Sequence, residues 1–156
     1  MDAVSIEALA GLRAAIQSLL PPQADVNLQS SIAIQPASIA PSGIGGFVGV
    51  NDNPVGEIIG RRIEGTVAIG LKAATANDMS GVLSATINAL LAADRATLLG
   101  QGLLQLTLAK VEAPVPGSGT AVQQQMSIQV LYEFLKIPVD AEGVIQEIPL
   151  NIQLQT

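Results

Sequence analysis

The chain has 156 residues and a net charge of −6, and it is 49% hydrophobic but only 2% aromatic. It contains no histidine, cysteine or tryptophan, so it lacks the commonest general base, thiolate nucleophiles and the usual nitrogen and sulfur metal ligands. This length fits one domain over residues 1–156 with an aliphatic core, and the composition favours packing and association over catalysis.

The apolar residues do not form a membrane span, although the mean hydropathy is +0.47. A spanning helix needs about 20 consecutive apolar residues, and polar residues or glycine interrupt every apolar run well short of that. Asp2 and Glu7 stand where a signal peptide would have a basic start and an apolar run. We therefore expect no membrane partner and retention where the protein is made; the lack of cysteine fits the cytosol.

Basic residues are too few and too dispersed for a phosphate-binding surface. The chain has seven, spread from Arg13 to Lys136, so we expect no direct nucleic-acid recognition. A chain with few charges and many aliphatic residues also leaves apolar surface that monomers rarely keep bare. We expect other subunits to cover part of it.

The first predicted element is an amphipathic helix over residues 2–20, where apolar residues recur at helical spacing. Asp2 or Ser5 can cap its start, and the proline pair at 21–22 ends it. A strand with partial alternation is predicted over residues 26–35.

Residues 36–56 are predicted to form a long loop, because prolines and glycines recur throughout the segment. Structureless loops longer than about 12–15 residues are uncommon in compact domains and are often functional. The loop is therefore a flexible surface segment or an arm that reaches a partner. Its glycines lack the spacing of a nucleotide-binding fingerprint.

Residues 57–73 are predicted to form a strand with aliphatic residues on one face and polar residues, among them Arg62 and Glu64, on the other. Adjacent strand residues point to opposite faces, which separates Arg61 from Arg62. The only basic doublet of the chain therefore makes no continuous patch.

A second helix is predicted over residues 79–99, with N-cap candidates at 75–78 and a stop at Gly100. Asp94 and Arg95 lie off its apolar stripe. They are candidates for polar contacts with a neighbouring subunit.

The rest of the chain is predicted to be strands. The strands and the breaks between them are a strand over 102–112, a loop over 113–120, a strongly alternating strand over 123–137, a turn over 140–143 and a strand over 144–154. The last two strands form a C-terminal β-hairpin over 123–154.

The last predicted strand is a candidate sheet edge. Pro149 lacks an N–H, which confines it to an edge strand. An uncovered edge with few charges is an aggregation hazard. We therefore predict that a subunit interface forms there, with Ile148, Pro149, Leu150 and Ile152 as its residues.

These elements predict an α+β fold: an antiparallel or mixed β-sheet packed against two helices, in the order α-β-β-α-β-β-β. The spacing of the carboxylates along the sequence does not indicate an active site. The nearest approach to a calcium loop, residues 51–53, is broken by Pro54. No serine lies in a G-x-S-x-G elbow, and without histidine a Ser-His-Asp triad is impossible. We expect no enzymatic activity, no metal and no cofactor.

About half of the chain, from Arg61 to Phe134, resembles the tail-terminator and tail-completion proteins of tailed bacteriophages and the cap proteins of contractile injection systems. The pattern runs RRIEGTVAIGLKA, NDMSGVLSATINALLAADRATLLGQG, LLQLTLAKVEAP, a broken loop and MSIQVLYEFLKIPVD. In that family a long helix crosses a sheet whose last strands end in an aliphatic-x-aromatic-x-aromatic run, as residues 130–134 do here. The loop at 36–56 and the strand at 144–154 depart from the family pattern.

The resemblance implies a structural protein of a virion tail or injection particle, assembled in the host cytoplasm. It implies a homo-oligomer, a hexameric ring, that closes the end of the tail tube and offers a docking face to sheath or neck proteins. Within that reading, the edge near Pro149 and the helix with Asp94 and Arg95 contact neighbouring subunits. Arg61, Arg62 and Glu64 are the candidates for contact with the tube or lumen.

Three other functions remain open from the sequence. The chain fits another structural tail component, a tube or sheath-associated protein that polymerises instead of stopping. It also fits a small binding domain for apolar ligands. A carboxylate-dependent enzyme would need a pocket with two converging acids.

Overall fold

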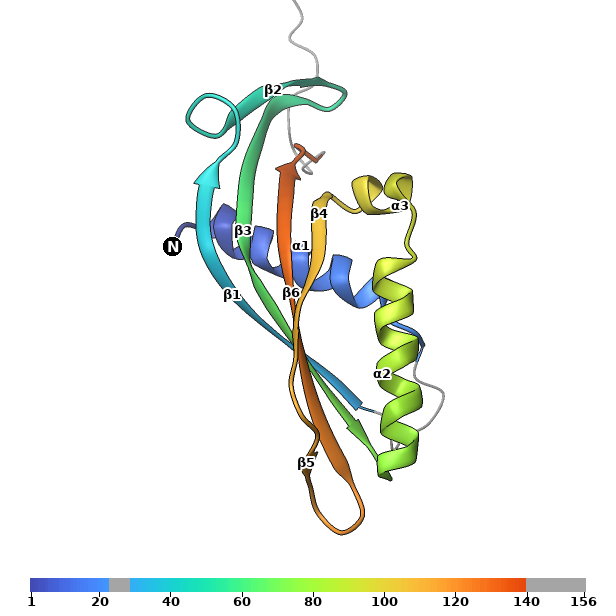
Figure 1. The fold of residues 1–156 in the computed structure, drawn as a ribbon. Helices are drawn as coiled ribbons and strands as arrows, with labels where there is room; N and C mark the ends of the chain where they lie inside the picture. Colours follow the sequence, from blue (N-terminus) through green and yellow to red (C-terminus); the bar gives the residue numbers. More distant parts are fainter. Residues whose placement is uncertain (23–28, 140–156) are drawn as a thin grey trace, which may run out of the picture.

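The structure is a computed structural model that describes residues 1–22 and 29–139. It has the α+β fold that the sequence predicts, with helices packed on an antiparallel sheet (Figure 1). The described elements, in chain order, are α1 (Ala3–Leu19), β1 (Gln29–Pro41), β2 (Phe47–Asp52), β3 (Val55–Ala73), α2 (Ala76–Leu91), α3 (Arg95–Gly100), β4 (Leu103–Val111), β5 (Val115–Pro116) and β6 (Val122–Lys136).

The strand order is β1-β3-β6-β4, with β2 paired to the start of β3 and β5 paired to the start of β6. The central strands β3 and β6 pair without a register shift from Ile59 opposite Lys136 to Ala73 opposite Val122. Every pairing is antiparallel. It follows that β1 and β4 lie at opposite sides of the sheet and run in opposite directions.

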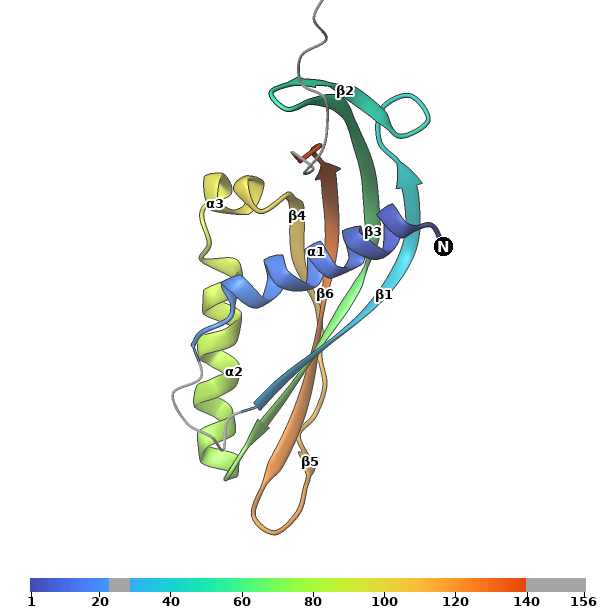
Figure 2. The same ribbon diagram turned by 180° about the vertical axis from the view of Figure 1, so that it is seen from behind.

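The core lies on one face of the sheet. α1 crosses the strands on that face, and α2 runs alongside them near the β4 side (Figures 1 and 2). Alternate residues of β3 and β6 point toward the helices, and the largest fully buried side chains are aliphatic: Leu12, Ile16, Ile63, Ile69, Met79, Leu90, Leu103, Met126, Ile128 and Val67. Burial of such side chains, at about 25 cal/mol per Å² of apolar area, is the main stabilising contribution.

Helix α1 confirms the helix predicted over residues 2–20. The Asp2 carboxylate accepts a hydrogen bond of 2.7 Å from the Ser5 backbone N–H and caps the first turn. Gly11 lets the helix approach β6 closely, because a Cβ at that position would lie 2.6 Å from the Tyr132 hydroxyl oxygen. α1 is therefore seated directly on the aromatic end of β6.

The prediction of a loop over residues 36–56 is wrong. β1 continues through Pro36, β2 follows, and β3 begins at Val55. Pro36 is tolerated because β1 is an edge strand with a register shift between Pro36 and Ser38. The turn before β2 uses three glycines with positive φ, namely Gly43, Gly45 and Gly46. The glycines and prolines mark turns and a bulge, and the segment is mostly strand.

The prediction of one helix over residues 79–99 is also wrong at its end. α2 stops at Leu91, and a separate short helix, α3, starts at Arg95. The reason is Asp94, whose carboxylate accepts a hydrogen bond of 2.7 Å from the Thr97 N–H and caps a new helix. The described part of the chain thus has three helices where two were expected.

The strands predicted over 57–73, 102–112 and 123–137 are confirmed as β3, β4 and β6. The predicted break at 113–120 holds the two-residue strand β5. The strand predicted to end at residue 35 continues to Pro41. The predicted return strand at 144–154, with Ile148, Pro149, Leu150 and Ile152, lies outside the described residues. Among the described helices, none is long and apolar enough to cross a membrane.

Candidate functional site

The sheet face turned away from α1 carries no helix in the part of the chain that the structure describes (Figures 1 and 2). We call it the bare face. Its side chains stand at alternate positions of four strands: Ser31, Ala33 and Gln35 of β1, Arg62, Glu64, Thr66, Ala68 and Gly70 of β3, Gln125, Ser127, Gln129, Leu131 and Glu133 of β6, and Gln105, Thr107 and Lys110 of β4.

Most of the bare face is small or uncharged. One row across the strands reads Gln35, Thr66, Gln129 and Thr107. The next row reads Ala33, Ala68, Ser127 and Lys110. Short side chains leave a broad surface with many hydrogen-bonding groups and little charge. The alternation in residues 123–137 predicted that Gln125, Ser127, Gln129 and Glu133 share a face, and the pairing confirms it.

Charged residues gather toward one end of the bare face. The Arg62 guanidinium donates a hydrogen bond of 2.9 Å to the Glu133 carboxylate. The Ser42 hydroxyl donates a longer bond of 3.4 Å to the same carboxylate oxygen. Glu64 is exposed beside this pair, and no hydrogen bond or ion pair of its side chain is recorded among the described residues. Arg62 and Glu64 are thus placed together on an accessible surface.

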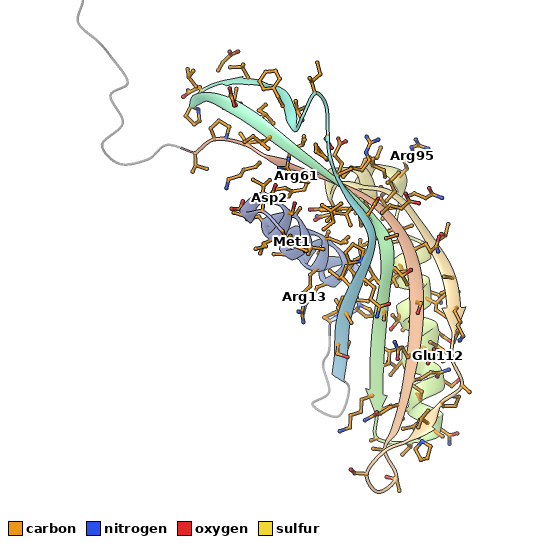
Figure 3. All side chains as sticks on the ribbon, turned by 90° about the vertical axis from the view of Figure 1, so that its left-hand side faces the viewer. Met1, Asp2, Arg13, Arg61, Arg95 and Glu112 are labelled. Carbon is orange, nitrogen blue, oxygen red and sulfur yellow. The ribbon has the colours of Figure 1, made fainter. Side chains whose placement is uncertain are left out.

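Arg61 is placed elsewhere. Its guanidinium lies on the helix side, donates a hydrogen bond of 2.7 Å to the Asp2 carboxylate and is only 13% exposed (Figure 3). The hydrogen bonds from Ser5 and, after them, from Arg61 hold the pKa of the Asp2 carboxyl well below its usual range. Arg61 therefore ties the start of α1 to β3, and its guanidinium lies on the opposite side of the sheet from Arg62 and Glu64.

The bare face holds two depressions. The larger, of about 530 Å³, lies where the start of β1, the end of β3 and the start of β6 meet. Its lining residues include Lys72 and Glu112. The smaller, of about 250 Å³, is lined by Glu64, Thr66, Gln105 and Gln129 among others. Both linings combine amide, hydroxyl and charged groups with a similar share of apolar surface, which does not suit a purely apolar ligand.

Asp94 and Arg95 are brought together only as neighbours in sequence. The Asp94 carboxylate caps α3, and the hydrogen bond from the Thr97 N–H lowers its pKa. Arg95 is exposed at the first position of α3, away from α1 (Figure 3). Asp94 thus has a structural role in the protomer, while Arg95 remains available for a contact with another molecule.

The structure adds exposed apolar residues that the sequence reading did not single out. One group, the hairpin group, lies on the β2–β3 hairpin: Phe47, Val48, Val50 and Val55, the last 81% exposed, with exposed Ile44 in the turn just before β2. A second lies along β4 and β5: Leu104, Leu108, Val111 and Val115. The β4 residues stand in a predicted strand, whereas the hairpin residues fall in the segment 36–56 that was predicted as a loop. Knowing that they stay uncovered requires the strand order.

Titratable groups give no catalytic arrangement within the described residues. There, no cluster of three Asp or Glu side chains is placed to hold a metal ion. Burial raises the pKa of Tyr132, which lies under α1 and away from both depressions. What the site offers chemically is a hydrogen-bonding surface with Arg62, Glu64 and Glu133 at one end and Lys72, Lys110 and Glu112 toward the other. No known protein family matches the sequence, and a comparison with curated proteins finds no significant match.

Proposed function

We propose that the chain is a structural ring protein that caps the end of a phage or phage-like tail tube. In this role it stops the polymerisation of the tube and provides a docking face for sheath or neck proteins. The observation that carries the proposal is the bare face. It is a broad, weakly charged sheet surface beside two strand edges that pair with no other strand among the described residues, which suits association with other proteins better than catalysis.

Exposed apolar residues support an assembled state. The hairpin group and the β4 group are strand residues that stay exposed in the protomer. Soluble monomers rarely leave large apolar patches uncovered. The two groups differ in residues and in position, as head-to-tail contacts require, and such contacts close into a ring when the rotation between subunits allows it.

Arg62 and Glu64 are the residues we propose for contact with the tube. Both are exposed on the bare face, and Arg62 already presents its charge next to Glu133. Charged groups at the rim of an interface set orientation and association rate more than affinity. Their role would be to orient the ring on the tube end.

Tube assembly in the presence of the purified chain tests the function. The tube protein of the same particle is polymerised with and without this chain, and tube lengths and ends are measured by negative-stain electron microscopy. We expect single rings and shorter tubes that end in a ring. The double variant Arg62→Glu, Glu64→Lys keeps the net charge and should cap poorly. The control Arg13→Glu alters a cation on α1, away from the bare face (Figure 3), and should cap like the wild type.

Two results would overturn the proposal. A strict monomer at micromolar concentration, even with the tube present, would exclude a ring. Stacked tubes formed by the chain itself would favour the alternative of a polymerising tube or sheath-associated component.

A further inference from the structure

We infer that neighbouring copies of this chain join through their sheet edges, with β1 of one copy paired antiparallel to β4 of the next. This inference specifies the contact between subunits of the ring proposed above. It rests on the proposed self-association of the chain and not on tube capping. In the described part of the chain, the outer edges of β1 and β4 pair with no other strand. Free backbone N–H and C=O groups on such edges are a ready template for another strand.

The composition of the edges points to a covered state. β1, QSSIAIQPASIAP, has no charged residue, and β4, LLQLTLAKV, has only Lys110. Edges that face water are usually blunted by charge, by short length or by bulges. β1 has 13 residues, and its segment from Ser31 to Gln35 is free of proline. β1 has a bulge between Pro36 and Ser38, and β4 has register shifts between Leu103 and Gln105 and between Leu108 and Lys110. The uncharged segment from Ser31 to Gln35 lies outside the β1 bulge and needs a cover, and a second copy supplies one of matching character.

The side chains of β1 and β4 have matching character on each face of the sheet. On the helix side, β4 presents Leu106, Leu108 and Val111, and β1 presents Ile32 and Ile34. On the bare face, β4 presents Gln105, Thr107 and Lys110. Opposite them β1 presents Ser31, Ala33 and Gln35. Pairing β1 with β4 therefore continues the apolar layer on one side and the polar surface on the other. Leu108 and Val111, each 38% exposed, would be covered by the neighbour's isoleucines.

Strand direction allows this pairing in a ring. β1 and β4 run in opposite directions within one copy, because each step across the sheet is antiparallel. Rotation about an axis along the strands keeps every strand direction, so β1 of the next copy arrives antiparallel to β4. The contact uses two different surfaces and repeats from copy to copy. The bare faces of all copies then join into one continuous surface.

The rows of the sheet set the expected register. Gln35 and Thr107 share one row, and Ala33 and Lys110 share the next. If the strands run along the ring axis, residues of the same row face each other across the interface. A tilt shifts the register by an even number of residues, because an odd shift would move apolar side chains to the polar face.

Disulfide trapping tests the pairing without background, because the chain has no cysteine. Single variants Ser31→Cys, Ala33→Cys and Gln35→Cys are each mixed with Gln105→Cys, Thr107→Cys and Lys110→Cys, oxidised and analysed by non-reducing electrophoresis. A disulfide needs Cα atoms about 4.4–6.8 Å apart. We expect one register to give far more cross-linked heterodimers than the others, and the double variant to give a ladder up to a closed ring. Ser84→Cys, on the exposed side of α2, is the control and should stay unlinked.

The outcomes separate this inference from the proposed function. Homodimers of the β1 variants alone would show twofold β1–β1 pairing and overturn the inference, as would linkage no greater than the Ser84→Cys control. Rings that cap tubes without such linkage would overturn the edge pairing and leave the capping function standing. Linkage in a protein that never shortens tubes would support the pairing and overturn the capping. Ala33→Lys, an exposed change on the bare face, should abolish association while the circular dichroism spectrum of the protomer stays unchanged.

Discussion

The two faces of the sheet come from the same strands but differ in side chains and in cover. In β6, the helix side carries Met126, Ile128 and Val130, and all three are buried. The bare face carries Gln125, Ser127 and Gln129 from the intervening positions. Within the described residues, the burial that stabilises the protomer is therefore concentrated on one face, and no helix covers the other. Substitutions at neighbouring positions of one strand should separate folding from association.

The largest effect is expected from truncating a core side chain. Ile128→Ala should lower the free energy of unfolding by about 2–5 kcal/mol, because the lost contacts leave a cavity. Gln129→Ala, one residue away on the bare face, should change it by less than about 0.5 kcal/mol. Urea unfolding followed by circular dichroism measures both. Equal losses would mean that the bare face is packed in the protomer.

Two glycines of β3, Gly65 and Gly70, allow the two faces to be compared by the space next to the backbone. At Gly65 a Cβ would lie 2.6 Å from Pro36 Cα and 2.8 Å from the Gln35 carbonyl oxygen, so Gly65→Ala must push β1 away. We expect a loss of about 1–3 kcal/mol. At Gly70 the close contact of a Cβ would be the Ser31 hydroxyl, at 2.7 Å, which can rotate away, while the Ser31 carbonyl oxygen lies at an ordinary 3.8 Å. Gly70→Ala should cost clearly less, and the difference in urea midpoint is the measurement.

Arg61 and Arg62 are adjacent in β3, and their ion pairs allow the two faces of the sheet to be compared. Arg61 is 13% exposed and paired with Asp2 on the helix side, while Arg62 is 52% exposed and paired with Glu133. Arg62→Gln should cost at most about 1 kcal/mol, as exposed ion pairs do. Arg61→Gln should lower the thermal midpoint more, because it also releases the start of α1. A larger effect at Arg62 would contradict this assignment.

The smallest effect is expected from the charge of Asp2 alone. Asp2→Asn keeps an oxygen that can accept the Ser5 N–H but removes the charge that faces Arg61. The lowered pKa of Asp2 means that its charge stabilises the folded state above the unfolded pKa of about 3.9. That stability is lost as the pH falls through the lower folded value. The difference between wild type and Asp2→Asn in thermal midpoint should be present at pH 6 and shrink below pH 4. A difference independent of pH would assign the effect to the cap.

The strands of the central sheet were predictable because period-two alternation is strong in β3 and β6. The segment 36–56 was not, since its prolines and glycines read as a loop. Pro36 is tolerated at a bulge of an edge strand, and edge position depends on the strand order. The end of α2 was missed because Asp94 reads equally well as a surface residue and as a cap. Of the candidate site, the placement of Arg62 and Glu64 on one face followed from alternation. The Arg61–Asp2 contact joins residues far apart in sequence and needed the fold.

Tyr132 gives the protomer a built-in optical probe. It is the only tyrosine, and the chain has no tryptophan, so emission excited beyond the absorption band of the two phenylalanines comes from one ring. That ring is 5% exposed and lies under Gly11 of α1. A change in its emission or quenching by iodide would therefore report the lifting of α1 from the sheet. The proposed assembly of a ring, and its proposed docking on a tube, can be tested for such a change at this position without an added label.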